Sequence, residues 1–252
     1  MFSAFAACRG CPMNAQQPSP SPPRPAVSGK FFRLGQAKFY LKGLTYGPFR
    51  LGPDGSPFPS AADTQRDFEQ IRTLGANTLR IYHVPPRWLL DMAQLYGLKL
   101  LIDIPWGKHV CFLDSPVLRR DACTAVRNAV QACARHPAVF AYSVVNELPP
   151  DIVRWSGPKA IEAFLDELVE VAKAVDPECL CTFSNYPPTE FLRPQNIDFV
   201  CFNVYLHQQR PFENYLARLQ MMADSKPLVL GEFGIDSLRE GEQQKCEILQ
   251  WQ

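Results

Sequence analysis

The fold is decided by the stretch VFAYSVVNE, from Val139 to Glu147. Its residues 139–145 are apolar or small and lack the alternation of a strand that has one face in water. A strand of this kind is buried on both faces, as parallel strands covered by helices are. Helical patterns flank it over residues 116–134 and 158–175. The stretch therefore predicts one strand of a βαβ arrangement.

The same alternation extends over the chain from Lys30 onward. A hairpin predicted between residues 31–34 and 39–41 leads into a first core strand that ends near Tyr46. Further strands are predicted at 78–82, 99–104, 139–145, 180–184, 199–203 and 228–231, with helices at 61–74, 86–96, 116–134, 158–175 and 212–223 and a last helical stretch after Ile235.

Strand and helix alternation of this kind predicts right-handed βαβ units and a parallel sheet. None of the strands is followed by G-x-G-x-x-G or by a P-loop, which disfavours a doubly wound nucleotide-binding fold. We therefore predict an α/β fold, a (β/α)8 TIM barrel. The 252 residues match the length of such a barrel, but the pattern supplies only seven core strands. The prediction is a barrel truncated after strand 7 and its helix, which needs about 40 more residues, one βα unit, to close.

Composition excludes several classes of protein. Hydrophobic residues make up 46% of the chain and charged residues 20%, as in a globular protein. No run approaches the roughly 18 apolar residues of a membrane span, so direct membrane insertion is not expected. The net charge of +1 gives no reason to expect a nucleic-acid partner.

Residues 1–29 differ from the rest, because they hold the proline-rich run PSPSPPRP and no acidic residue. We predict a disordered leader over 1–29 and the barrel domain over 30–252. The start lacks the basic residues and long apolar core of a signal peptide, so a cytoplasmic location is expected, with an organelle-targeting leader as the alternative. Cys8 and Cys11 have the spacing of half a zinc site, but no matching pair follows them.

Reactive groups of a (β/α)8 barrel lie at the carboxyl ends of its strands. The sequence places a polar and aromatic set there, without a Ser-His-Asp order, a Cys-His pair or a cluster that suggests a metal, so no cofactor is expected. The set is Tyr46, Arg80, His83, Asp103, Trp106, Asn146, Glu147, Asn185, Asn203, Tyr205 and Glu232.

Two glutamates in this set, Glu147 and Glu232, suit glycoside hydrolysis. One carboxyl must donate a proton to the leaving oxygen, and the other must be ionised to attack or to activate water. Arg80 on a neighbouring strand end favours an ionised Glu232, and partial burial favours a neutral Glu147. A glutamate at a strand end can equally be the ion-pair partner of a lysine or arginine, so spacing alone leaves both interpretations open.

Four local sequences add a resemblance. Residues 136–147 resemble the acid/base signature of family 2 glycoside hydrolases, roughly H-P-S-x-x-x-x-W-S-x-x-N-E, and residues 77–85 resemble the signature N-x-x-R-x-x-H-Y-P. Residues 203–205 are similar to the N-x-Y of that family, and residues 226–234 to its nucleophile segment. The resemblance covers about residues 38–236 and extends to the wider group of retaining clan-A hydrolases, which includes family 5.

The resemblance implies a role for each matching residue. Glu147 would be the acid/base and Glu232 the nucleophile of a retaining double displacement, with the two carboxyls roughly 5 Å apart. Asn146 would bind the sugar 2-hydroxyl, while Tyr205 and Arg80 would orient Glu232. His83 would line the site.

The sequence also departs from this family. Tyr142 stands where the family usually has Trp, and Arg135 where it usually has Asn. The first 29 residues are too few to form the β-sandwich domains that precede the barrel in family 2. The chain is also similar to barrels that bacteria fuse to a membrane family 2 glycosyltransferase, which implies such a fused partner in the full-length protein.

Other candidates have two interpretations each. Trp106, Trp155 and Tyr186, expected in loops after strands, either stack on sugar rings or pack within the protein. Lys108 is expected on the solvated surface. His207, two residues after Tyr205, either reaches the site or lies outside it. Asn185 completes the predicted substrate-binding set with Asn146, Arg80, His83, Tyr205, Trp106 and His207.

The function predicted from these residues is a retaining glycoside hydrolase, or a transglycosylase, that acts on a β-linked oligosaccharide or glucan. The alternative is a carbohydrate-binding barrel that has lost activity.

Overall fold

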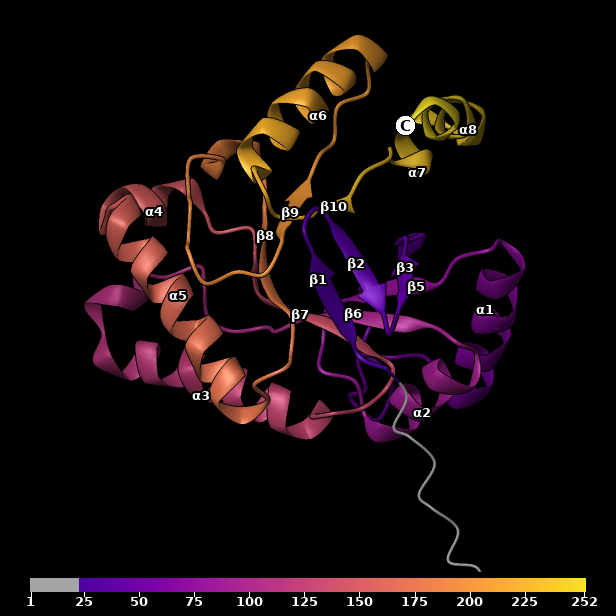
Figure 1. The fold of residues 1–252 in the computed structure, drawn as a ribbon. Coiled ribbons are helices and arrows are strands. Elements are labelled where there is room, and N and C mark those ends of the chain that lie inside the picture. The colour runs from indigo at the N-terminus through magenta and orange to yellow at the C-terminus, as the bar shows by residue number, and fades with distance from the viewer. Residues whose placement is uncertain (1–22) are drawn as a thin grey trace, which may run out of the picture.

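Seven parallel strands form the centre of the protein in a computed structural model that describes residues 23–252 (Figure 1). They are adjacent in sequence order, which confirms the predicted barrel topology and its seven core strands. The strands are β4 (Gly43–Thr45), β5 (Thr78–Ile81), β6 (Lys99–Asp103), β7 (Val139–Asn146), β8 (Cys181–Asn185), β9 (Val200–Asn203) and β10 (Leu228–Glu232).

Long helices surround the strands, as Figure 1 shows. In α5 the residues Ile161, Phe164, Leu165 and Leu168 are all buried, so this face of the helix packs against the barrel. The long helices are α1 (Ala61–Thr73), α2 (Arg87–Leu95), α3 (Pro116–Cys133), α5 (Pro158–Val175), α6 (Gln209–Ala223) and α8 (Glu242–Trp251).

Shorter helices lie in the connections. They are η1 (Phe112–Asp114), α4 (Pro150–Ser156), η2 (Pro187–Thr189) and α7 (Ser237–Glu240). The helix α4 was not predicted from the sequence, which led us to expect Trp155 in a loop. Proline is compatible with the first turn of a helix, where its missing N–H would have no intrahelical partner. Trp155 therefore lies on a helix, where its indole Nε1 donates to Asp114 Oδ2 at 2.7 Å.

A small antiparallel sheet precedes the barrel. It consists of β1 (Pro25–Ser28), β2 (Phe31–Leu34) and β3 (Ala37–Phe39), in that order, and contains the predicted hairpin. Phe32 packs edge-on against Phe140 and Phe199, with ring centroids 5.0 and 5.2 Å apart. The sheet thus covers the amino ends of the barrel strands.

The predicted disordered leader extends too far, because its residues 25–28 form the strand β1. Val27 pairs with Phe32 in the antiparallel register of β1 and β2, so the ordered fold begins at least as early as this strand. The remainder of the predicted leader, with Cys8 and Cys11, lies outside the described residues.

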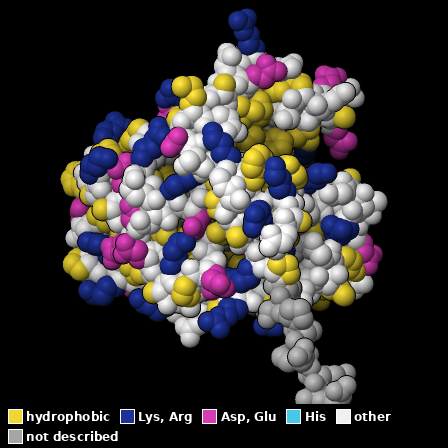
Figure 2. Space-filling view, viewed as in Figure 1, with side chains coloured by type: hydrophobic (Ala, Val, Ile, Leu, Met, Phe, Trp, Pro, Cys, Tyr) yellow, Lys and Arg dark blue, Asp and Glu magenta, His cyan; other side chains and the backbone are white. Residues whose placement is uncertain are grey.

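The barrel wall is open between its two edge strands. β4 and β10 do not pair with each other, and a hollow of about 1120 Å³ lies between them. In the view of Figure 2, yellow apolar side chains gather in the hollow between α6 and α8, whereas the hollow between β4 and β10 has Phe39, Leu44, Val229 and Leu230 among its lining residues. We call it the open seam. All residues of β10 are only partly buried, whereas those of β8 are buried.

One buried hydroxyl in the barrel wall leads to a stability prediction. The Tyr142 side chain is fully buried, and its hydroxyl has no hydrogen-bond partner within residues 23–252. Burying an unpaired hydroxyl destabilises a protein by about 1–3 kcal/mol. Tyr142→Phe is therefore expected to raise the free energy of unfolding by about 1 kcal/mol in urea titrations. Tyr46→Phe is the matched control, because Tyr46 donates to Asp67 Oδ2 at 2.7 Å and should lose stability. A Tyr142→Phe protein less stable than wild type would contradict the prediction.

Candidate active site

Two strands change register just before the predicted glutamates. On β10 the pairing with β9 shifts between Leu230 and Glu232. On β7 the pairing with β8 shifts between Ser143 and Asn146, directly before Glu147. An extra residue of this kind redirects the side chains that follow it. Both shifts therefore help to set the direction of a glutamate at the carboxyl end of its strand.

Arg80 of β5 lies at the centre of the site. Its guanidinium is almost fully buried and contacts four other strands. Burial, the largest single effect, lowers the pKa of Arg80, but the charge and hydrogen bond of Asp103 together with other neighbouring groups raise the pKa above its usual value. The partners are Asp103 Oδ2 (2.6 Å from Nε), Asn146 Oδ1 (2.8 Å), Asn203 Oδ1 (2.7 Å) and Glu232 Oε1 (2.9 Å).

The backbone beside Glu232 leaves space for this guanidinium. A Cβ on Gly231 would lie 2.8 Å from both an Arg80 nitrogen and Asn203 Oδ1, and 2.7 Å from Cys201 Sγ. Real Cβ atoms do not approach backbone or rigid neighbours so closely. Glycine is therefore required at this point of close approach.

Glu232 accepts hydrogen bonds from two phenols in addition to its ion pair with Arg80. Tyr82 donates to Oε1 at 2.8 Å, and Tyr205 donates to Oε2 at 2.7 Å. Burial raises the pKa of both phenols above the usual value, and the contact with Glu232 raises it further. Both tyrosines thus remain donors, and the carboxylate is fixed by three groups.

Glu147 lies on the other side of Arg80. Asn203 Nδ2 donates to Glu147 Oε1 at 2.7 Å, while the Oδ1 atom of the same amide accepts from Arg80. Asn203 Nδ2 also lies 3.1 Å from Asn146 Oδ1. Arg80 and Asn203 are thus the two side chains that connect the carboxyl groups of Glu147 and Glu232.

The structure brings together five of the predicted site residues and leaves four outside the network. The five are Arg80, Asn146, Glu147, Tyr205 and Glu232. His83 contacts the Phe58 ring, with centroids 6.4 Å apart. His207 Nε2 lies 3.1 Å from Gly234 O and joins the loops after β9 and β10.

Trp106 packs within the protein. Its indole Nε1 donates to Val144 O at 2.7 Å, and its ring lies edge-on to Phe112 and Phe164 at centroid distances of 4.9 and 6.0 Å. Of the two interpretations of Trp106, the structure favours packing.

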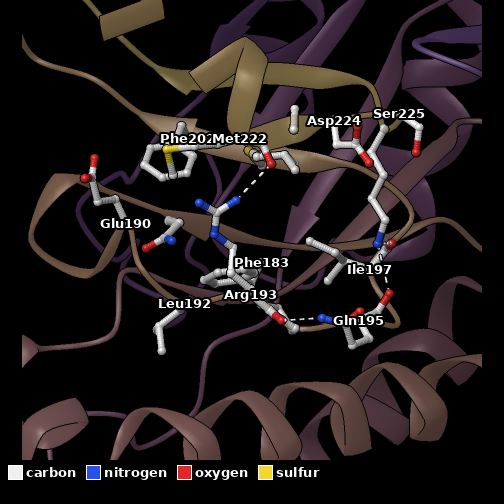
Figure 3. Close-up of a pocket in the computed structure, with 16 residues that line it drawn as sticks. Phe183, Glu190, Leu192, Arg193, Gln195, Ile197, Phe202, Met222, Asp224 and Ser225 are labelled. Carbon is white, nitrogen blue, oxygen red and sulfur yellow. Dashed lines mark hydrogen bonds between the residues drawn. The ribbon is translucent and has the colours of Figure 1, made fainter. Parts of the chain in front are cut away.

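Asn185 faces a different cavity. Its amide is used within the turn after β8, where it accepts from Thr189 Oγ1 at 2.7 Å and donates to Thr189 O at 3.1 Å. It also lines a cavity of about 240 Å³ outside the glutamate site. Figure 3 shows this second cavity, with Arg193 reaching across it to Met222 O.

Four residues of the network had no role assigned from sequence. Tyr82 and Asn203 belong to the quoted motifs, and Asp103 was noted only as a strand end. The fourth, Lys108, is a correction, because it was expected on the solvated surface. Its Nζ instead donates to the carbonyls of Asn146 and Glu147. Nothing in the sequence of the loop after β6 indicates this contact.

The described part of the chain offers no group of three or more His, Cys, Asp or Glu side chains arranged to hold a metal ion. Among the helices of residues 23–252, none has the length and apolar composition to cross a bilayer.

Comparison with known proteins gives one family and several relatives. The pattern of "Glycosyl hydrolases family 2, TIM barrel domain" matches residues 54–250. β-Glucuronidase of Felis catus is 27% identical over 234 residues, and that of Homo sapiens 26% over 233, each across 84% of this chain. The chain spans 33% of the length of these curated relatives. A β-glucuronidase from Ruminococcus gnavus in complex with D-glucuronic acid superposes with a TM-score of 0.77 at 19% identity, over 91% of this chain and 42% of that one.

Proposed function

Because the chain belongs to the glycosyl hydrolases of family 2, through their TIM barrel domain, we propose that it cleaves β-linked glycosides with retention of configuration. The observation that carries the proposal is the pair of glutamates joined through Arg80 and Asn203. Each comes from the carboxyl end of a barrel strand, where such enzymes place their reactive groups.

The roles of the two glutamates follow from their partners. Glu232 accepts from Tyr82 and Tyr205 and pairs with Arg80, so both of its oxygens are held in place by donors, and we assign it the role of nucleophile. An ionised carboxylate is the nucleophile that a retaining mechanism requires. Within residues 23–252, Glu147 receives one side-chain hydrogen bond, from Asn203, and we assign it the role of proton donor.

The reaction then has two steps. Glu232 attacks the anomeric carbon and forms a glycosyl ester, while the glycosidic C–O bond breaks and Glu147 gives its proton to the leaving oxygen. In the second step Glu147 takes a proton from water, the hydroxide attacks the anomeric carbon, and the ester bond to Glu232 breaks. A sugar hydroxyl in place of water would make the same step a transglycosylation.

The substrate class within this proposal is a β-linked oligosaccharide or glucan. β-Glucuronides join the candidates, because the curated relatives are β-glucuronidases. The sugar is identified by a panel of aryl β-glycosides that differ only in the glycone: glucoside, galactoside, glucuronide and mannoside.

Trapping of the glycosyl-enzyme tests the proposal. Incubation with dinitrophenyl 2-deoxy-2-fluoro-β-glycosides of the same sugars is expected to add one glycosyl mass to the peptide that contains Glu232, as read by mass spectrometry. The fluorine slows both steps, and the activated leaving group restores the first, so the ester accumulates. Glu147→Gln is the matched control and should still be labelled, because dinitrophenolate departs without a proton. Labelling of another carboxylate would contradict the assignment, and no labelling together with no turnover of the panel would favour a binding barrel.

A further inference from the structure

The loop after β6 fastens the end of β7. From this loop Trp106 donates to Val144 O at 2.7 Å, and Lys108 donates to the carbonyls of Asn146 and Glu147, the latter at 3.0 Å. Two side chains of one loop therefore hold three backbone carbonyls: two at the end of β7, and that of Glu147, the predicted acid/base. These contacts are side chain to backbone, so their effect is on the path of the chain.

The backbone at Glu147 needs such support. Its φ angle is +43°, in the left-handed region that residues with a Cβ rarely adopt. Conformations of this kind persist only where the surroundings hold them. The Glu147 N–H donates to Ser184 O at 2.8 Å, and the Glu147 carbonyl accepts from Lys108. Both polar groups of this residue's backbone are therefore tied, one by β8 and one by Lys108.

We propose that Lys108 is a positioning residue, which sets the direction of the Glu147 carboxyl by holding the Asn146 and Glu147 carbonyls. The inference rests on the proposed function, in which Glu147 gives its proton to the leaving group. Lys108 acts through the backbone and not on the substrate. Hydrogen bonds from a charged donor are about twice as strong as neutral ones, and Lys108 is half-buried, where solvent screens them less.

A second lysine in the protein is a matched control. Lys226 is also half-buried, and its Nζ donates to two backbone carbonyls, those of Gln195 and Ile197 at 2.9 and 2.6 Å. Burial lowers the pKa of both lysines below the usual value. Lys226 lines the second cavity, which Figure 3 shows and which lies away from the glutamates. Replacing either lysine removes the same kind of anchor, but only Lys108 is attached to Glu147.

The experiment compares Lys108→Met and Lys226→Met on two aryl β-glycosides of the sugar that the panel selects. Phenol is a poor leaving group that needs a proton, whereas dinitrophenolate is a good one that does not. We expect Lys108→Met to lower kcat/KM on the phenyl glycoside about 10- to 100-fold, within the range of general acid catalysis, and on the dinitrophenyl glycoside less than about 3-fold. Lys226→Met should change both values by the same factor while losing comparable stability in urea.

Each outcome decides the proposal. If Lys108→Met lowers kcat/KM equally on both substrates, or on neither, the positioning role is overturned. The proposed function still stands in that case, provided that the wild type is active. Lys108→Gln, which removes the charge that strengthens these bonds, replaces Lys108→Met if that variant does not fold; it should lower kcat/KM selectively on the phenyl glycoside, and an unchanged ratio of the two substrates there also overturns the role. A wild-type protein that cleaves no member of the panel contradicts the proposed function and this inference with it.

Discussion

Glu232→Gln is expected to lower kcat by about 10⁴-fold or more on every aryl β-glycoside that the wild type cleaves. The amide has the shape of the carboxylate but cannot form the glycosyl ester, and covalent catalysis contributes several orders of magnitude. Turnover is measured at saturating substrate, and circular dichroism and urea unfolding establish that the variant is folded.

The matched control for this variant is Glu213→Gln on α6. Glu213 is an exposed carboxylate that accepts from Gln209, one turn away on the same helix, so its replacement should leave kcat unchanged. A Glu232→Gln protein that retains more than about a tenth of wild-type activity would contradict the nucleophile assignment, since no other group could replace an attacking carboxylate at that level.

Arg80→Met is expected to lower both stability and activity. Removing the guanidinium leaves Asp103 buried without its cation, which destabilises a protein by about 3–5 kcal/mol. The same change releases Glu232, Asn146 and Asn203 from their shared donor, and kcat should fall by at least about 10³-fold. Urea unfolding and turnover of an aryl β-glycoside measure the two effects.

A double variant separates the two effects of Arg80. Adding Asp103→Asn to Arg80→Met removes the unpaired buried charge and should restore part of the free energy of unfolding, but it should restore no turnover. Arg120→Met, at an exposed position of α3, is the control for loss of an arginine. Recovery of activity in the double variant would show that Arg80 acts on stability alone.

The strands could be predicted because their signal is local. Residues 139–145 are apolar or small throughout, and burial on both faces favours this in a parallel sheet. The missed helix α4 and the shifted leader boundary have a different origin. Pro150 and Pro25 both suggested irregular backbone, whereas proline is tolerated in the first turn of a helix and at the first residue of a strand.

The sequence predicted only those site residues that lie at the ends of predicted strands. Glu147 and Glu232 follow apolar runs and Arg80 lies near the end of its strand, so topology alone brings them to one end of the barrel. The role of Tyr82 could not be found in this way, because an aromatic residue at the end of a strand is typical of packing as well as of a site. The register shifts before both glutamates, and the reach of Lys108 to backbone carbonyls, depend on hydrogen bonds that have no pattern in the sequence.

The open seam has a consequence for the electric field at Glu232. Arg80 and Glu232 line this hollow as well as the site, so the medium that fills it forms part of their surroundings. Charges attract more strongly across an apolar medium than across water, because the effective dielectric constant is lower. Water in the seam weakens the hold of Arg80 on Glu232, and an apolar segment seated there strengthens it. The medium in the seam therefore affects the attraction between Arg80 and Glu232 from the side wall of the barrel.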